Sequence, residues 1–168
     1  MIPLVVKSTD PLAVEKSINI LKKGGVIVYP TDTLYGFGVD ANNNYAIERI
    51  NKLKNRHSPM SVIACRFEQA MSWTNIKEKD IKIAKKILDS SSTLILDAKK
   101  NIVSNKILGK NNTTLGLRIP KHKYCYDISK EYDKPITTTS VNRSGEQPLN
   151  DPKSIFKIFG EGIDLLID

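Results

Sequence analysis

The segment that determines the fold reads Val26-Ile27-Val28-Tyr29-Pro30-Thr31-Asp32-Thr33-Leu34-Tyr35-Gly36-Phe37-Gly38. Its apolar start predicts a buried strand, and the residues from Pro30 to Gly38 predict a turn. A second polar turn at 137–145 follows another short apolar run. Backbone amides and hydroxyls at strand ends form the usual cradle for phosphates and small polar ligands in α/β folds. The sequence therefore predicts one site built from both turns, with Lys54 and Arg56 supplying positive charge.

Apolar runs alternate with helical periods along the rest of the chain, which predicts an α/β domain. Asp10 and Pro11 predict a helix start, with Asp10 as the N-cap, and the glycines at 24 and 25 predict its end. In the helix predicted at 44–53, Tyr45, Ile50 and Leu53 are expected to face inward. Strands are predicted at 26–29, 61–65, 93–96, 115–119, 136–139 and 163–167, and the remaining helices at 77–88, 124–132 and 152–159.

The composition fits one compact domain spanning residues 1–168. A chain of 168 residues with 40% hydrophobic residues can bury a sizeable core. The sequence contains neither an apolar stretch of roughly 20 residues nor a signal peptide, so we expect a cytoplasmic protein with no membrane partner. Cys65 and Cys125 lack metal-type spacing and are expected to be buried apolar side chains.

The net charge of +8 allows two interpretations. A basic balance is expected of a protein that binds tRNA or another RNA. However, 21 of the 26 basic residues are Lys, as AT-rich coding would produce, so the charge can equally be a solvated surface. The scarcity of Arg makes a specific geometric role more plausible for Arg56, Arg118 and Arg143. The lysines that could contact RNA are Lys77, Lys79, Lys82, Lys85, Lys86, Lys121 and Lys123.

The first turn and the Lys54–Arg56 pair each have a functional and a structural interpretation. Thr31 and Thr33 lie two residues apart, so their hydroxyls would share one side, with Tyr35 continuing that face, and could bind a small polar substrate. Alternatively, the threonines satisfy their own turn backbone. Lys54 and Arg56 can point together toward phosphate or carboxylate oxygens, or can stabilise a helix C-terminus.

In the second turn, Ser140 and Asn142 are expected to project on one side, with Ser144 and Gly145 forming the bend. The sequence contains no Walker lysine, no dinucleotide-binding glycine pattern, no Cys/His metal set and no Ser-His-Asp constellation. No metal ligands are therefore predicted. His57 could titrate near neutrality and act on a substrate, but a surface histidine is the alternative.

These motifs together resemble the YrdC family of threonylcarbamoyl-AMP synthases. The matching pieces occur in the family's order over essentially the whole chain: residues 24–36, Lys54-Asn55-Arg56 with Pro59 soon after, Leu117-Arg118-Ile119-Pro120, and residues 139–148. The resemblance implies a single-domain, twisted, open mixed β-sheet flanked by helices (YrdC/RibB-like), with a basic concave face. It also implies a nucleotidyltransferase that condenses L-threonine, bicarbonate and ATP into threonylcarbamoyl-adenylate and pyrophosphate.

The resemblance also implies roles for individual residues. Lys54 and Arg56 resemble the catalytic pair that holds the triphosphate and carbamate oxygens, and Mg²⁺ would accompany ATP. The adenylate would pass to a threonylcarbamoyl-transferase complex that modifies tRNA. The positions matching threonine-binding residues are Thr31, Thr33, Tyr35 and Ser140, and those matching nucleotide-binding residues are Lys54, Arg56, Arg118, Asn142, Ser144 and Asn150.

The sequence departs from the family pattern at three places. The loop after Arg56 is shorter, Asp89-Ser90-Ser91-Ser92 stands where relatives carry Pro-Gly-Pro, and the chain is expected to lack the C-terminal segment of longer relatives. These departures leave open an alternative function, a YrdC-like RNA-binding module without synthase activity.

Overall fold

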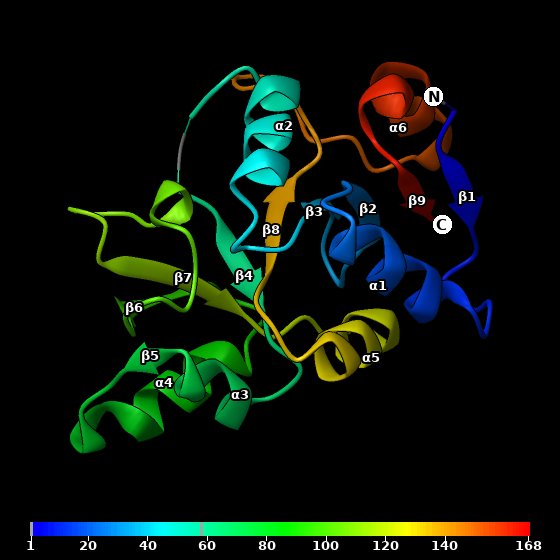
Figure 1. Ribbon diagram of the computed structural model, residues 1–168. Helices are drawn as coiled ribbons and strands as arrows, with labels where there is room; N and C mark the ends of the chain where they lie inside the picture. Colours follow the sequence, from blue (N-terminus) through cyan, green and yellow to red (C-terminus); the bar gives the residue numbers. More distant parts are fainter. Residues whose placement is uncertain (1, 58) are drawn as a thin grey trace.

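The computed structural model describes residues 2–57 and 59–168, and a nine-stranded sheet with flanking helices forms its centre (Figure 1). The strand order is β1-β9-β2-β3-β8-β4-β7-β6-β5. β9 is parallel to both of its neighbours and β4 is parallel to β7, whereas the other pairs are antiparallel. The predicted open, mixed α/β sheet is therefore confirmed. The strands are β1 (Leu4–Val6), β2 (Ile27–Pro30), β3 (Tyr35–Gly38), β4 (Ser61–Ile63), β5 (Thr74–Asn75), β6 (Leu94–Ala98), β7 (Thr114–Arg118), β8 (Ile136–Ser140) and β9 (Leu165–Ile167).

The helices begin and end largely where the sequence predicts. The Asp151 side chain caps α6, and the Asn43 side chain caps α2. The prediction that Asp10 is the N-cap of the first helix is wrong: α1 begins at Ala13, and Asp10 instead accepts a hydrogen bond from the Leu12 amide at 2.7 Å in the preceding turn. The helices are α1 (Ala13–Lys22), α2 (Asn44–Lys54), α3 (Phe67–Ser72), α4 (Ile81–Leu88), α5 (Lys123–Tyr132) and α6 (Pro152–Phe159), with 3-10 turns η1 (Glu78–Asp80), η2 (Asn105–Ile107) and η3 (Gly160–Gly162).

The predicted turn at 30–38 is in fact a β-hairpin. β3 pairs antiparallel with β2, and the turn itself is confined to the residues between Pro30 and Tyr35. Glycine is generally disfavoured in strands. At position 38 it is required, because a Cβ there would lie 2.6 Å from the Tyr29 ring. Tyr29 passes this glycine and donates a hydrogen bond to the Thr137 carbonyl of β8 at 3.0 Å.

Strand β8 joins the two halves of the sheet and lies at the centre of the view in Figure 1. It pairs with β3 on one side and with β4 on the other. In the β3–β8 pair, Gly36 is opposite Ser140. The two polar turns, more than a hundred residues apart in the sequence, therefore leave the sheet side by side, as predicted.

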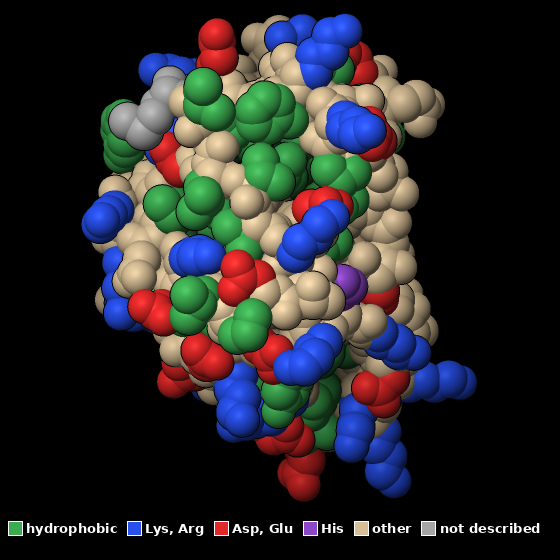
Figure 2. All heavy atoms as spheres, turned by 90° about the vertical axis from the view of Figure 1, so that its right-hand side faces the viewer, with side chains coloured by type: hydrophobic (Ala, Val, Ile, Leu, Met, Phe, Trp, Pro, Cys, Tyr) green, Lys and Arg blue, Asp and Glu red, His purple; other side chains and the backbone are tan. Residues whose placement is uncertain are grey.

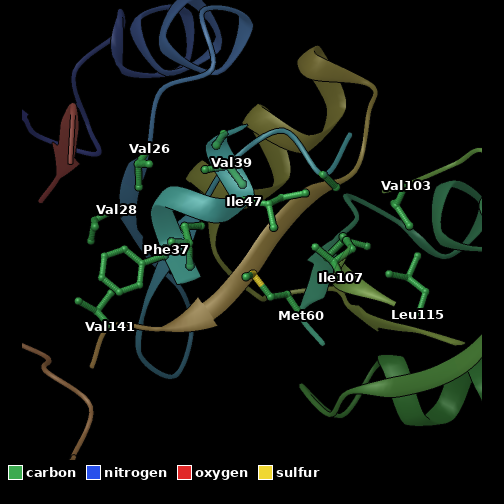
Figure 3. Close-up of a cluster of buried hydrophobic side chains, with 14 of the residues drawn as sticks. Val26, Val28, Phe37, Val39, Ile47, Met60, Val103, Ile107, Leu115 and Val141 are labelled. Carbon is green, nitrogen blue, oxygen red and sulfur yellow. The ribbon is translucent and has the colours of Figure 1, made fainter. Parts of the chain in front are cut away.

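Apolar clusters cover both faces of the sheet. Successive residues of β2 point to opposite sides, so this strand contributes to both clusters. Val28 packs with Phe37 and with Ile47 of α2 in one apolar cluster (Figure 3). Ile27 and Tyr29 pack in a second cluster, whose members include residues of α1 and α5. The predicted burial of Cys65 and Cys125 is confirmed, as is that of Ile50, whereas Tyr45 is 73% exposed rather than inward-facing.

The side of the molecule that carries β1 and α6 exposes apolar side chains (Figure 2). Ile2, Pro3, Phe156 and Ile158 line an open hollow of about 810 Å³ there. β1 and β5, the two edge strands, were not predicted, and neither was α3. Within residues 2–57 and 59–168, no helix is both long enough and apolar enough to cross a membrane.

Candidate functional site

The β2–β3 loop is held by the hydroxyl of Thr31. Its Oγ1 donates to the Leu34 carbonyl at 2.7 Å and accepts from the amides of Thr33 and Leu34 at 3.1 and 3.2 Å. Thr31 therefore satisfies its own turn, which is the structural alternative for this residue. The hydroxyls of Thr31 and Thr33 lie 3.2 Å apart, so the predicted common side is confirmed.

Thr33 lies at the exposed side of this loop and contacts Arg118. The Arg118 Nη2 donates to Thr33 Oγ1 at 3.1 Å and lies 3.8 Å from a carboxylate oxygen of Asp32. Arg118 is the last residue of β7, so a strand from the other half of the sheet supplies a cation to the hairpin loop. A guanidinium beside a hydroxyl can bind the oxygens of a carboxylate or a phosphate.

The second turn is organised by the side chain of Asn142. Its amide nitrogen donates to the carbonyls of Arg143 and Glu146, both at 2.9 Å, and its Oδ1 accepts from Ser140 Oγ at 2.6 Å. Ser140 and Asn142 therefore project on one side, as predicted. In this structure, however, the Asn142 amide is engaged within the turn rather than directed at a ligand.

Lys54 ends α2 and is almost fully buried, with 2% of its surface exposed. Its Nζ donates to the carbonyl of Ser140, to the carbonyl of Asn142 at 3.1 Å and to Asn142 Oδ1 at 3.0 Å. The Phe37 ring also faces this ammonium, with its centroid at 5.7 Å. Burial, and secondarily the charge of Arg56, lowers the pKa of Lys54 to about 8. Lys54 thus anchors the second turn with all three of its hydrogens.

Arg56 is exposed, in contrast to Lys54. Asn55 has a left-handed φ of 53°, which ends the helix and turns the chain, so that Lys54 is buried while Arg56 is exposed. That the two side chains act on one ligand remains a prediction. No hydrogen bond or ion pair of the Arg56 side chain is present among the described residues, although its charge acts on Lys54. Arg56 is therefore available to an anionic ligand.

The remaining predicted residues lie around the second turn, with the exception of His57. The Ser144 amide donates to the Lys54 carbonyl at 2.8 Å, and the Val141 amide donates to the Tyr35 carbonyl at 3.3 Å. Asn150 is exposed and directly follows Leu149, whose amide bonds to Val141. His57 is exposed beside Asn51 and Glu48, as the surface alternative predicts.

Sequence reasoning missed two polar residues next to Arg118. Asp32 accepts a hydrogen bond from the Ser91 hydroxyl at 2.6 Å, and the Ser91 carbonyl accepts from Arg118 at 3.4 Å. Asp32 lies within the quoted segment, but no local pattern links it to Ser91, 59 residues away. In the sequence, the serine run at 90–92 stands out only as a departure from the family pattern.

Most of the chain matches the model of one protein family. The model named for Sua5, YciO and YrdC, whose description is "Telomere recombination", matches residues 19–168. The chain belongs to this family. Two similar relatives are named threonylcarbamoyl-AMP synthase. The one from Neisseria meningitidis is 29% identical over 85% of this chain and 77% of its own length, and the one from Psychromonas ingrahamii is 28% identical over 90% and 82%.

Solved structures give the same fold for this Sua5/YciO/YrdC protein. Escherichia coli YciO superimposes with a TM-score of 0.85 at 22% identity, covering 99% of this chain and 82% of its own. P. abyssi Sua5 complexed with L-threonine superimposes with a TM-score of 0.85 at 25% identity and covers the whole of this chain. The present chain spans about half the length of that Sua5 (50%).

Proposed function

We propose that this protein is a threonylcarbamoyl-AMP synthase, which condenses L-threonine, bicarbonate and ATP into threonylcarbamoyl-adenylate and releases pyrophosphate. The observation that carries the proposal is the meeting of the two polar turns at the Gly36–Ser140 pair, in a chain whose relatives of that name match most of its length. Strand ends that meet in this way are the usual position of nucleotide sites in α/β folds.

Threonine is assigned to the side of the site that holds Thr33 and Arg118. The hydroxyl of Thr33 is exposed, and the guanidinium beside it is suited to the substrate carboxylate. Arg118 was expected to bind the nucleotide, but its contact with Thr33 favours the amino acid. Tyr35 and Ser140, at the junction of the two turns, complete this side.

The nucleotide is assigned to the second turn. Arg56 is an exposed cation beside this turn and makes the first contact with the triphosphate. Lys54 supplies a second positive charge, but its ammonium must release at least one carbonyl oxygen before it can donate to a phosphate. Ser144 and Asn150 lie at the surface of the same turn and are assigned to the nucleotide.

This arrangement fits a reaction that requires positioning more than acid–base groups. The threonine amine attacks the bicarbonate carbon and water leaves, which yields a carbamate. A carbamate oxygen then attacks the α-phosphorus of ATP, and pyrophosphate leaves with the electron pair of the broken P–O bond. Cations and backbone amides that hold these anions in line can provide most of the rate enhancement. Mg²⁺ enters with ATP as part of the substrate, held by phosphate oxygens and water.

The product is assigned to tRNA modification, since an acyl-adenylate is an activated donor that a transferase complex must consume. Direct contact with tRNA would use the exposed lysines of α4, where Lys82, Lys85 and Lys86 line one surface hollow.

The test is threonine-dependent release of pyrophosphate from ATP in the presence of bicarbonate. We expect release from the unaltered protein and a loss of at least about tenfold in Arg56→Lys, because an ammonium cannot make the two-pronged contact of a guanidinium. Arg66→Lys, at an exposed arginine paired with Glu68, is the matched control and should leave the rate unchanged. Normal release from Arg56→Lys would overturn the role of Arg56. Absence of release from the unaltered protein, together with salt-sensitive RNA binding, would favour an RNA-binding module instead.

A further inference from the structure

Asp32 lies at the centre of a partly buried polar cluster that no role in the proposed reaction explains. Its side chain is 12% exposed, and that of the neighbouring Arg118 is 19% exposed. The closest approach between them is 3.8 Å, from Asp32 Oδ1 to Arg118 Nη2. This oxygen is buried and has no hydrogen-bond partner among the described residues. Burying a carboxylate oxygen without a hydrogen-bond donor lowers the stability of the folded protein, so a role outside stability is expected for Asp32.

Ser91 connects this carboxylate to Arg118 a second time. Its hydroxyl donates to Asp32 Oδ2 at 2.6 Å, and its carbonyl accepts from Arg118 Nη2 at 3.4 Å. Ser91 has a left-handed φ of 59°, which residues other than glycine rarely adopt. The hydrogen bond to Asp32 therefore stabilises a loop conformation that places the Ser91 carbonyl beside the guanidinium.

The contacts restrain one nitrogen of Arg118 and leave the others available. Nη2 carries two hydrogens, one directed to Thr33 Oγ1 and the other to the Ser91 carbonyl. Nη1 and Nε make no hydrogen bond within residues 2–57 and 59–168. The free hydrogens of Nη1 and Nε lie on different edges of the guanidinium, so each can donate one hydrogen bond to an oxygen of an anionic ligand.

We propose that Asp32 is a positioning residue, which acts with Ser91 to fix the direction of the Arg118 guanidinium so that its free N–H groups can donate to the oxygens of an incoming carboxylate. The identification of this carboxylate as that of L-threonine rests on the proposed function. The orientation of Arg118 by Asp32 does not. The Asp32 carboxylate is ionised near neutrality: burial opposes its ionisation, but the Ser91 hydrogen bond, the Lys121 backbone amide and the Arg118 charge together outweigh burial and lower its pKa.

The first test measures the motion of Arg118 without any ligand. Asp32→Asn keeps the shape of the side chain and removes its charge. Asp89→Asn removes the same charge from an exposed residue two positions before Ser91 and is the matched control. The NMR order parameter of the Arg118 Nε–H bond should fall in Asp32→Asn toward that of the exposed Arg143, and stay unchanged in Asp89→Asn. Should Asp32→Asn fold poorly, Ser91→Ala removes the same link and should give the same decrease.

The second test separates binding from chemistry. In Asp32→Asn, the KM for L-threonine should rise about tenfold while kcat changes less than about twofold, because Arg118 would bind substrate and transition state alike. In an Arg118→Lys background, the same substitution should have almost no further effect on KM, since the residue to be positioned is absent.

The outcomes separate the two proposals. An unchanged Arg118 order parameter in both Asp32→Asn and Ser91→Ala would overturn the positioning role, whatever the substrate. The positioning role would also be overturned if Asp32→Asn raised the KM for L-threonine by the same factor in the unaltered protein and in the Arg118→Lys background. If the unaltered protein shows no threonine-dependent turnover, the proposed function fails, and the order parameter alone decides the role of Asp32.

Discussion

The Lys54 ammonium donates to the backbone carbonyl and to the side-chain oxygen of Asn142, 88 residues further along the chain. In return, the Ser144 amide donates to the Lys54 carbonyl at 2.8 Å. The end of α2 and the turn after β8 are thus bonded in both directions. The residue expected to hold phosphate is also the residue that holds the turn, so ligand binding and the stability of this turn are coupled.

Lys54→Met tests the structural part of this role. Methionine fills a similar volume but has no hydrogen to donate, so the carbonyls of Ser140 and Asn142 lose a buried donor. We expect the free energy of unfolding to fall by about 1–3 kcal/mol. Denaturant unfolding followed by circular dichroism measures it. An unchanged unfolding midpoint with lost ATP binding would mean that Lys54 serves the ligand alone.

The lowered pKa of Lys54 predicts opposite pH trends for binding and stability. Burial first, and Arg56 second, lowers this pKa from 10.5 to about 8, so the ammonium that attracts ATP is lost as the pH rises through about 8. ATP affinity should therefore weaken above pH 8, and binding there should take up a proton. Between about pH 8 and 10.5 the unfolded chain holds this proton more tightly, so the Lys54 contribution to stability rises with pH.

Calorimetry in buffers of different ionisation enthalpy measures this proton uptake. The control is Lys54→Arg, whose guanidinium stays charged and should give an affinity that does not change between pH 7 and 9. If the unaltered protein takes up no proton above pH 8, Lys54 does not change its protonation on binding.

Asn142→Ala should destabilise the second turn. The change removes donors to the Arg143 and Glu146 carbonyls and an acceptor for Lys54, and we expect a loss of about 1–3 kcal/mol. Asn150→Ala is the matched control, because this exposed side chain makes no hydrogen bond within the described residues. It should weaken ATP binding with almost no change in melting temperature. The reverse pattern would exchange the roles of these two asparagines.

Gly38→Ala tests the close approach within the hairpin. A Cβ at this position would lie 2.6 Å from the buried Tyr29 ring, which cannot move aside, and overpacking of this kind costs about 1–3 kcal/mol. At Gly36 the nearest atom to an added Cβ is the Thr138 hydroxyl oxygen, at 3.1 Å, so Gly36→Ala should cost less. Thermal unfolding of the two variants gives the comparison, and equal melting temperatures would contradict it.

The sequence predicted the elements whose signals are local. The α/β alternation, the start of α6 at Pro152 and the meeting of the two turns follow from apolar runs, helical periods and polar strand ends. β3 could not be predicted in this way, because its two glycines disfavour a strand by propensity, and Gly38 is explained only by the close approach of the Tyr29 ring. β1 and β5, with three and two residues, are too short to show a period.

The site was predicted as a set of residues rather than as a set of contacts. Lys54, Ser140 and Asn142 do lie together, but the sequence could not show that their polar atoms bond to one another. The link between Asp32 and Ser91 spans 59 residues and leaves no periodic pattern. Such long-range hydrogen bonds depend on tertiary packing, which the local sequence does not encode.

The most direct measurement is mass spectrometry of the product formed from ATP, L-threonine and ¹³C-labelled bicarbonate. We expect threonylcarbamoyl-adenylate that carries the label, in an amount that depends on all three substrates and falls sharply in Arg56→Lys. If no labelled adenylate forms while the folded protein still binds RNA with a steep salt dependence, the synthase assignment is contradicted.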